Sequence, residues 1–296
     1  MAPNMHESST DVSSNDVISR IYLIRHGARF DYANPSWLDS ARENGAMVTD
    51  PPLSALGHRQ ARETADQMRR LTKKMNDEGE SSSTNDDSSS HHVDKILVSP
   101  YLRVIQTASP TSDALGLPLC IEHGLSESHA TPDKLPTPQQ RFAYFPQIDP
   151  TYTSQLAVHP TPGHTCSKTG HPCEAFAGKY CQRMGRFATV LENNYRGKTI
   201  VLFSHAASVA LVASLLRCSM RKLKFAPCGI FQLERINDGP WKMVRNGDSN
   251  EDYVKENTAT TYPWGFGEKY FEQGKGYNGS GIEEGIGLDY FVPEEN

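Results

Sequence analysis

Two histidines and three arginines stand just after three short apolar runs, each typical of a buried strand. The runs cover residues 20–24, 95–98 and 199–203. The charged residues that follow them are Arg25, His26, Arg29, Arg103 and His205. Arginine forks match the oxygens of phosphate or carboxylate, and an imidazole can attack an ester or move a proton. None of these turns contains a carboxylate, so clustered guanidiniums would need an anion between them. Phosphate suits several arginines at once.

The spacing of apolar residues predicts helices between the strands. Helices are predicted over 54–76, from Tyr101 to about Ala114, from Glu174 to Tyr195 and over Ala206–Leu216. Further strands are predicted at Leu119–Ile121, 229–235 and 241–245. Strands that alternate with helices predict an α/β fold with a mostly parallel sheet. Ligands of such sheets bind where the strands end at their carboxyl edge. The arginine and histidine residues of one turn alone would be interpreted as surface charges, but three such turns at one edge of the sheet predict a phosphate pocket.

Four ordered motifs resemble those of the histidine phosphatase superfamily, which includes the phosphoglycerate mutases. They are the segments 25–27 (RHG), 53–61 (LSALGHRQA), 99–107 (SPYLRVIQT) and 204–205 (SH). Arg29 and the Ser-His-Ala sequence are most similar to the branch of suppressor of T-cell receptor signalling phosphatases and ecdysteroid-phosphate phosphatase. The resemblance implies a three-layer α/β/α sandwich of the phosphoglycerate mutase type.

The resemblance assigns the nucleophile to His26. Three nearby arginine charges should lower the pKa of His26 and keep the imidazole neutral, with one ring nitrogen donating to a backbone carbonyl. Arg25, Arg103 and Arg29 would hold the phosphate oxygens, and His205 would donate to the same group.

An acid must protonate the leaving oxygen, and the family takes it from a mid-chain loop. The segment Gly124-Leu125-Ser126-Glu127 resembles that loop, so Glu127 is the candidate. The alternative is an aspartate elsewhere, such as Asp133, with Glu127 a surface residue.

These residues predict a metal-independent phosphomonoester hydrolase that works through a phosphohistidine and needs no cofactor. One alternative is phosphoryl transfer of the phosphoglycerate mutase type. Another, of a different class, is a phosphate-pocket scaffold or phosphotyrosine-binding module without turnover. The expected substrate is a phosphorylated small molecule or a phosphoprotein, and its specificity should lie in the loops at 30–50 and 128–172. The oligomeric state stays open.

Composition divides the chain into a body and two polar ends. Residues 1–19 are predicted to be disordered, 20–247 to form the phosphatase domain, and 77–92 to be a flexible insert of serine, threonine and acids. The tail at 248–296 holds eleven acidic residues against three lysines, so the body is slightly basic. Its aromatic residues predict that the tail packs on the domain. They are Tyr262, Trp264, Phe266, Tyr270, Phe271 and Tyr277.

The 296 residues, 22% charged and 37% hydrophobic with a net charge of −5, are typical of a globular chain rather than a nucleic-acid binder. The polar first sixteen residues predict neither a signal peptide nor a membrane anchor. We expect an intracellular protein, in the cytoplasm rather than the nucleus, with reduced cysteines. Four residues in one loop could bind metal, although the usual spacings are missing. They are His164, Cys166, His171 and Cys173.

Overall fold

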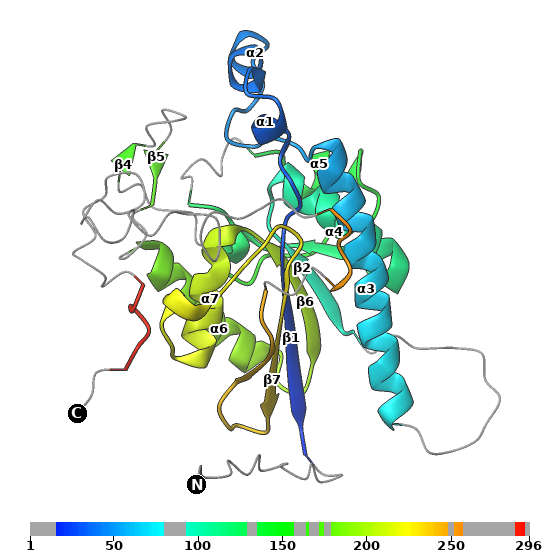
Figure 1. Ribbon diagram of the computed structural model, residues 1–296, viewed down its shortest axis with the longest axis vertical. Helices are drawn as coiled ribbons and strands as arrows, with labels where there is room; N and C mark the ends of the chain where they lie inside the picture. The colour runs from blue at the N-terminus through cyan, green and yellow to red at the C-terminus, as the bar shows by residue number, and fades with distance from the viewer. Residues whose placement is uncertain are drawn as a thin grey trace, which may run out of the picture.

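A six-stranded sheet runs through the middle of the molecule in the order β3-β2-β6-β1-β7-β8 (Figure 1). The computed structural model describes residues 16–79, 93–128, 135–156, 164–165, 172–174, 179–247, 252–256 and 288–293. The strands are β1 (Ile18–Arg25), β2 (Lys95–Val98), β3 (Leu119–Ile121), β6 (Thr199–Ser204), β7 (Ile230–Ile236) and β8 (Lys242–Arg245). Strands β3, β2, β6 and β1 run parallel, β7 is antiparallel to β1, and β8 is antiparallel to β7. Strands β4 (His164–Thr165) and β5 (Pro172–Cys173) form a separate antiparallel pair.

Helices cover both faces of the sheet, so the predicted three-layer α/β/α sandwich is confirmed (Figure 1). The α-helices are α1 (Phe30–Ala33), α2 (Trp37–Glu43), α3 (Ala55–Gly79), α4 (Leu102–Leu115), α5 (Pro138–Phe142), α6 (Cys181–Asn194) and α7 (Val209–Leu216). Short 3-10 turns are η1 (His123–Leu125), η4 (Ala206–Ser208) and η5 (Met220–Lys222). Helices α3 and α4 pack together on one face, and α6 and α7 pack together on the other. Within the described parts of the chain, no helix is long and apolar enough to cross a membrane.

Strand β1 shows why the central runs are apolar at every position. Ile21 and Leu23 face the cluster built with α6 and α7, whereas Tyr22 and Ile24 face the cluster built with α4. A strand that is buried on both faces has no solvent side for polar residues. The parallel strands all end at one edge of the sheet, the upper edge in Figure 1, so the residues after them converge there.

Two predicted boundaries are wrong. Strand β1 starts at Ile18, inside the segment predicted to be disordered. Helix α6 starts at Cys181 rather than at Glu174, because the backbone N–H of Glu174 donates to Ser128 O (2.7 Å) and its carboxylate pairs with Arg183. A tertiary ion pair thus overrides a helical pattern. The 30–50 loop, predicted to be irregular, holds α1 and α2.

Two described pieces of the acidic tail contact the domain. Tyr253 is buried against the α4 side of the sheet, and its hydroxyl donates to the carbonyl of Cys228 (2.5 Å). Leu288 is fully buried on the opposite face, near α6 and α7. The six aromatic residues behind the tail prediction, and residues 80–92 of the predicted insert, lie outside the described residues. Their placement stays a prediction.

The start of α3 packs directly on the turn that follows β1. The carbonyl of Ala28 accepts the backbone N–H of Ser54 (2.9 Å), and the N–H of Ala28 donates to the side chain of Gln60 (2.8 Å). A Cβ on Gly57 would lie 2.2 Å from the carbonyl oxygen of Ala28. The motif at 53–61 therefore positions the turn at 25–29, and glycine is required where helix and turn touch.

The motif at 99–107 supports the same turn from the other side. The hydroxyl of Thr107 accepts the backbone N–H of Gly27 (3.1 Å). The side chain of Gln106 accepts the N–H of Leu53 (2.8 Å), which fixes the chain just before α3. Helices α3 and α4 thus hold the segment that carries His26 between them.

Replacing Gly57 with alanine should destabilise the protein. The added methyl group meets backbone rather than a flexible side chain, so α3 or the turn must shift, at a cost of about 1–3 kcal/mol in the free energy of unfolding. Urea denaturation measures this change. Gly185→Ala is the matched control, because its Cβ would meet Phe291 at an ordinary 3.5 Å within α6. That control should leave stability unchanged or raise it by about 0.5–1 kcal/mol. Equal stability of Gly57→Ala and wild type would contradict the close packing.

Candidate active site

His26 follows β1 as a buried, neutral imidazole. Its Nδ1 lies 2.8 Å from the carbonyl oxygen of Gly27, so Nδ1 must carry the proton and donate it. The lone pair of the ring is then left on Nε2. Burial and the charges of Arg103 and Arg25 hold the pKa of His26 well below its usual range. The predicted backbone hydrogen bond is confirmed, and the ring has the form that a nucleophile requires.

His205 follows β6, with its ring centroid 5.5 Å from that of His26. Arg103 Nη2 lies 3.1 Å from His205 Nδ1, and Ser99 Oγ lies 2.8 Å from Nε2. Because a guanidinium can only donate, Nδ1 accepts here and Nε2 donates to the serine. The ring is fully buried and stands edge-on to Tyr101 at 5.1 Å. Ser99 thus fixes which nitrogen faces the arginine.

Arg103 is a cation with few partners. Its side chain is only 1% exposed, Nε has no hydrogen-bond partner, and Nη1 makes a long 3.5 Å contact to Thr49 O. Within the described part of the chain, the nearest carboxylate oxygens belong to Asp50 (3.8 Å) and Glu127 (3.7 Å), beyond hydrogen-bond distance. Burial, and after it the charge of Arg29, lower the pKa of Arg103. The guanidinium remains charged and retains the capacity to bind an anion.

The other two arginines are held more firmly. Arg29 donates from Nε and Nη2 to the two carboxylate oxygens of Asp31 (2.9 and 2.8 Å), and its guanidinium lies 4.4 Å from the Tyr32 ring centroid. Arg25 donates from Nη1 to the carbonyl of Phe225 (2.5 Å), and burial lowers its pKa to about 10. Three predicted phosphate ligands thus lie around the carboxyl ends of β1 and β2.

Carboxylates from outside the three turns join the arginine cluster, among them the predicted acid, Glu127. Asp31 pairs with Arg29, and the carboxylates of Asp50 and Glu127 approach Arg103. Asp50 comes from a loop outside the three turns, so inspection of the turns alone does not reveal it. The charges of these carboxylates offset part of the cost of burying guanidinium groups.

Glu127 joins the cluster from the loop after β3 and η1. Its Oε2 lies 3.4 Å from His205 Nδ1, and its side chain is 12% exposed. Its other oxygen accepts the backbone N–H of Ser128 (3.2 Å). The structure therefore brings together all six residues singled out from the sequence. The alternative acid, Asp133, lies outside the described residues.

Sequence reasoning missed several residues that hold this cluster. Asp50 accepts the N–H of Leu102 (2.7 Å) at the start of α4 and pairs with Arg141 (2.6 Å). No local signal marks Asp50. Arg183 is different, because it lies on the buried face of α6 between Tyr180 and Met184, and an arginine on an apolar helix face is itself a signal.

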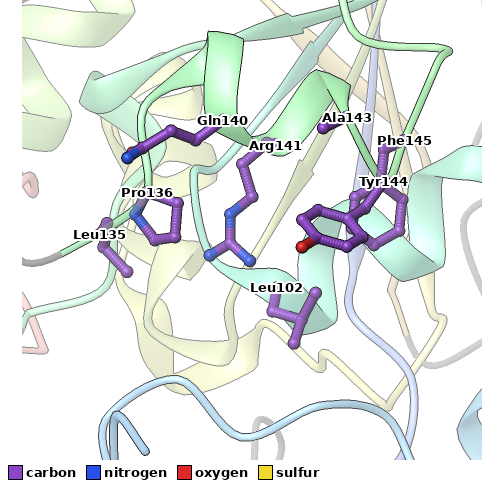
Figure 2. A pocket seen from close by; sticks show the side chains of 8 residues that line it. All are labelled: Leu102, Leu135, Pro136, Gln140, Arg141, Ala143, Tyr144 and Phe145. Atoms are coloured by element: carbon purple, nitrogen blue, oxygen red, sulfur yellow. The ribbon is translucent and has the colours of Figure 1, made fainter.

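A cavity of about 920 Å³ lies at the start of α4 (Figure 2). The Arg141 side chain extends between Pro136 and Tyr144, and the other lining residues are Leu102, Leu135, Gln140, Ala143 and Phe145. Arg141 pairs with Asp50, the carboxylate that also approaches Arg103, so this ion pair links the lining of the cavity to the arginine cluster. Its size and largely apolar lining suit a small organic group.

The possible metal ligands are only partly described. His164 and Cys173 are cross-strand partners in the β4–β5 pair, whereas Cys166 and His171 lie outside the described residues. In the described part of the chain, no three His, Cys, Asp or Glu side chains are grouped as a metal site. Whether the four residues bind metal stays open.

The depressed pKa of His26 predicts acid-sensitive stability. The unfolded chain takes up a proton below about pH 6.5, whereas folded His26 stays neutral, so the folded state loses stability as pH falls. Between pH 7.5 and 5.5, His26 should lower the free energy of unfolding by about 1.4 kcal/mol. Urea denaturation of wild type and His26→Gln at both pH values measures this contribution, because the variant should lose about 1.4 kcal/mol less stability than the wild type over the same range. Between pH 7.5 and 8.5 the two pH slopes should agree. Equal acid losses would mean that His26 is protonated in the folded protein.

Several solved structures share this fold. The ecdysone phosphate phosphatase of Bombix mori, in complex with tungstate, is 20% identical, with 77% of this chain and 93% of that chain covered and a TM-score of 0.52. A phosphoserine phosphatase from Entamoeba histolytica, in complex with 3-phosphoglyceric acid, is 17% identical over 77% and 96%, with a TM-score of 0.45. A mycobacterial glucosyl-3-phosphoglycerate phosphatase is 17% identical over 78% and 99%, with a TM-score of 0.43. At 20% identity and a TM-score of 0.52, the likeness to the first of these shows the fold alone.

Membership in a family follows from the sequence match. No curated protein matches the chain. The sequence model of the histidine phosphatase superfamily (branch 1) matches residues 21–249, which include every residue of the site described above. The predicted family is therefore confirmed, and the chain belongs to the histidine phosphatase superfamily.

Proposed function

We propose that the protein hydrolyses phosphomonoesters through a phosphohistidine formed on His26. The observation that carries this proposal is the buried Arg103 guanidinium, which has an unpartnered Nε and, among the described residues, no carboxylate within hydrogen-bond distance. A neutral imidazole with a free Nε2 lies in the same cluster. An anion with an electrophilic centre fits both groups, and a phosphate ester is such an anion. Membership in the superfamily supports phosphomonoester hydrolysis in general.

The first step transfers the phosphoryl group to His26. Its Nε2 forms a bond to phosphorus while the ester P–O bond breaks, and the protonated Glu127 carboxyl gives its proton to the leaving oxygen. Arg103, Arg25 and the Nη1 group of Arg29 hold the phosphoryl oxygens, where negative charge gathers.

The second step releases phosphate. A water molecule attacks phosphorus, the Glu127 carboxylate takes the water proton, and the bond between phosphorus and His26 Nε2 breaks. His205 would donate to the phosphoryl group from Nδ1, once Arg103 turns from that nitrogen to a phosphate oxygen. For this, Nδ1 takes a proton from a water molecule, and Nε2 gives its proton through the Ser99 hydroxyl back to water, so the ring changes tautomer with no net gain of protons.

The substrate in this proposal is a phosphorylated small molecule or a phosphoprotein. The similar structures include phosphatases named for ecdysone phosphate, phosphoserine and glucosyl-3-phosphoglycerate. Those names describe the other proteins. All the residues that line the cavity of Figure 2, except Leu102, lie inside the 128–172 loop expected to set specificity.

Release of phosphate from para-nitrophenyl phosphate in excess EDTA tests the nucleophile. We expect turnover by the wild type and a loss of at least about 10³-fold in His26→Ala, because no other group can form the covalent intermediate. Circular dichroism of both proteins is the control for folding. Substantial turnover by a pure, folded His26→Ala preparation would exclude His26 as the nucleophile. No turnover by folded wild type would overturn the phosphatase proposal in favour of mutase-type transfer or phosphate binding.

Glu127→Gln tests the proton donor. The variant should lose about 10²–10⁴-fold in turnover of an alkyl phosphate such as glycerol phosphate, whose leaving alkoxide needs a proton. Turnover of para-nitrophenyl phosphate should fall much less, because its phenoxide leaves readily without one. Steady-state assays of both substrates with both proteins give the ratio. Equal losses on the two substrates would count against Glu127 as the acid.

A further inference from the structure

The segment that carries Glu127 is held in place along its whole backbone. We call residues 124–128 the acid loop. All five of its carbonyl oxygens accept hydrogen bonds from outside the loop. The donors are Arg183 to Gly124, Ser126 and Glu127, the Ser204 hydroxyl to Leu125, and the Glu174 N–H to Ser128. In a surface loop, such carbonyl oxygens would ordinarily accept hydrogen bonds from water.

Arg183 makes most of these contacts. It projects from the first turn of α6, its side chain is only 2% exposed, and its Nη1 donates to Gly124 O (2.8 Å) and Ser126 O (3.0 Å). Its Nη2 donates to the carbonyl of Glu127 itself (3.3 Å). The planar guanidinium thus gathers three peptide groups of one short segment, which the single ammonium of lysine cannot reproduce.

Glu174 completes this arrangement by neutralising the arginine. Its carboxylate accepts Arg183 Nη2 at 2.6 Å and Nε at 3.2 Å. Because the pair is neutral as a whole, it places no net charge beside Glu127. Its effect on Glu127 must then be geometric rather than electrostatic.

Two further side chains bind the acid loop and hold it beside His205, the histidine that faces Glu127. Ser204 is the last residue of β6 and directly precedes His205, and its hydroxyl donates to Leu125 O (2.9 Å). At the start of the loop, the buried carboxylate of Glu122 accepts the N–H of Gly124 (3.1 Å). These contacts fix the 3.4 Å approach of Glu127 Oε2 to His205 Nδ1.

We propose that the Arg183–Glu174 pair positions Glu127 for proton transfer, so that Arg183 is a positioning residue for the acid step. This inference rests on the proposed phosphatase function and on Glu127 as its acid. A misplacement of about 1 Å can cost about 10²-fold in a catalysed step. Arg183 itself touches no reacting atom, so its loss should resemble a partial loss of Glu127 rather than a loss of phosphate binding.

The test compares turnover of glycerol phosphate and para-nitrophenyl phosphate in wild type, Glu127→Gln and Arg183→Lys. Lysine keeps the charge beside Glu174 but cannot span the three carbonyls. We expect Arg183→Lys to lose at least about tenfold in kcat on glycerol phosphate and only a few-fold on para-nitrophenyl phosphate, with KM little changed. The double variant Arg183→Lys with Glu127→Gln should be no more selective than Glu127→Gln alone, because the acid is already missing.

Two further variants separate positioning from stability. Leu191→Ala opens a cavity in the same helix without touching the acid loop, and it should lower the Tm while leaving the ratio of the two activities unchanged. The double variant Arg183→Met with Glu174→Leu removes both buried charges together. It should fold even if a single change, which would leave one buried charge unpaired, does not. The double variant should show the same selective loss as Arg183→Lys.

The possible outcomes distinguish the positioning role of Arg183 from the proposed phosphatase function on which it rests. Absence of turnover in wild type would overturn the proposed function and the inference with it. Equal losses of Glu127→Gln on the two substrates would remove the acid assignment. A selective loss in Glu127→Gln, together with equal losses on both substrates in folded Arg183 variants, would overturn the positioning role alone.

Discussion

The Arg103 guanidinium is buried with an unpartnered Nε, and none of the carboxylates that the structure describes is in hydrogen-bond contact with it. Bringing such a cation out of water is costly, and the structure offsets this cost only in part, with Asp50 and Glu127 at 3.7–3.8 Å. The same charge helps to keep His26 neutral and fixes the tautomer of His205. A phosphate group would supply the missing anion, so substrate binding and stabilisation of the site become one interaction.

Most of the motif residues act on the backbone rather than on the substrate. Gly57 allows α3 to touch the turn after β1, and Gln60 and Thr107 bind N–H groups of that turn. His26, the proposed nucleophile, therefore lies on a segment with little freedom to move. Preorganisation of this kind spares the reaction the cost of arranging its own groups.

Glu127, the proposed acid, is held by different means. It lies on a loop, and loops tend to be mobile unless their peptide groups are bound. Here Arg183, paired with Glu174 in a buried ion pair, binds three of the loop carbonyls. His26 and Glu127 are thus placed by independent supports, α3 and α4 for His26 and α6 for Glu127, which meet at the carboxyl edge of the sheet (Figure 1).

The sequence by itself determined the order of strands and helices, the parallel core and the chemistry at the strand ends. It did so because buried parallel strands must be apolar throughout and because the residues after them must converge. The resemblance of the segment 124–127 to a family loop indicated Glu127, but only the tertiary structure decided that Asp50 enters the arginine cluster. Asp50 lies far from Arg103 in the chain, and no local pattern reports a contact between distant loops. The start of α6 shows the same limit, since the pairing of Glu174 with Arg183 prevailed over a helical pattern that continued through it. Local propensities are worth fractions of a kcal/mol per residue, whereas a buried charge without its partner costs several.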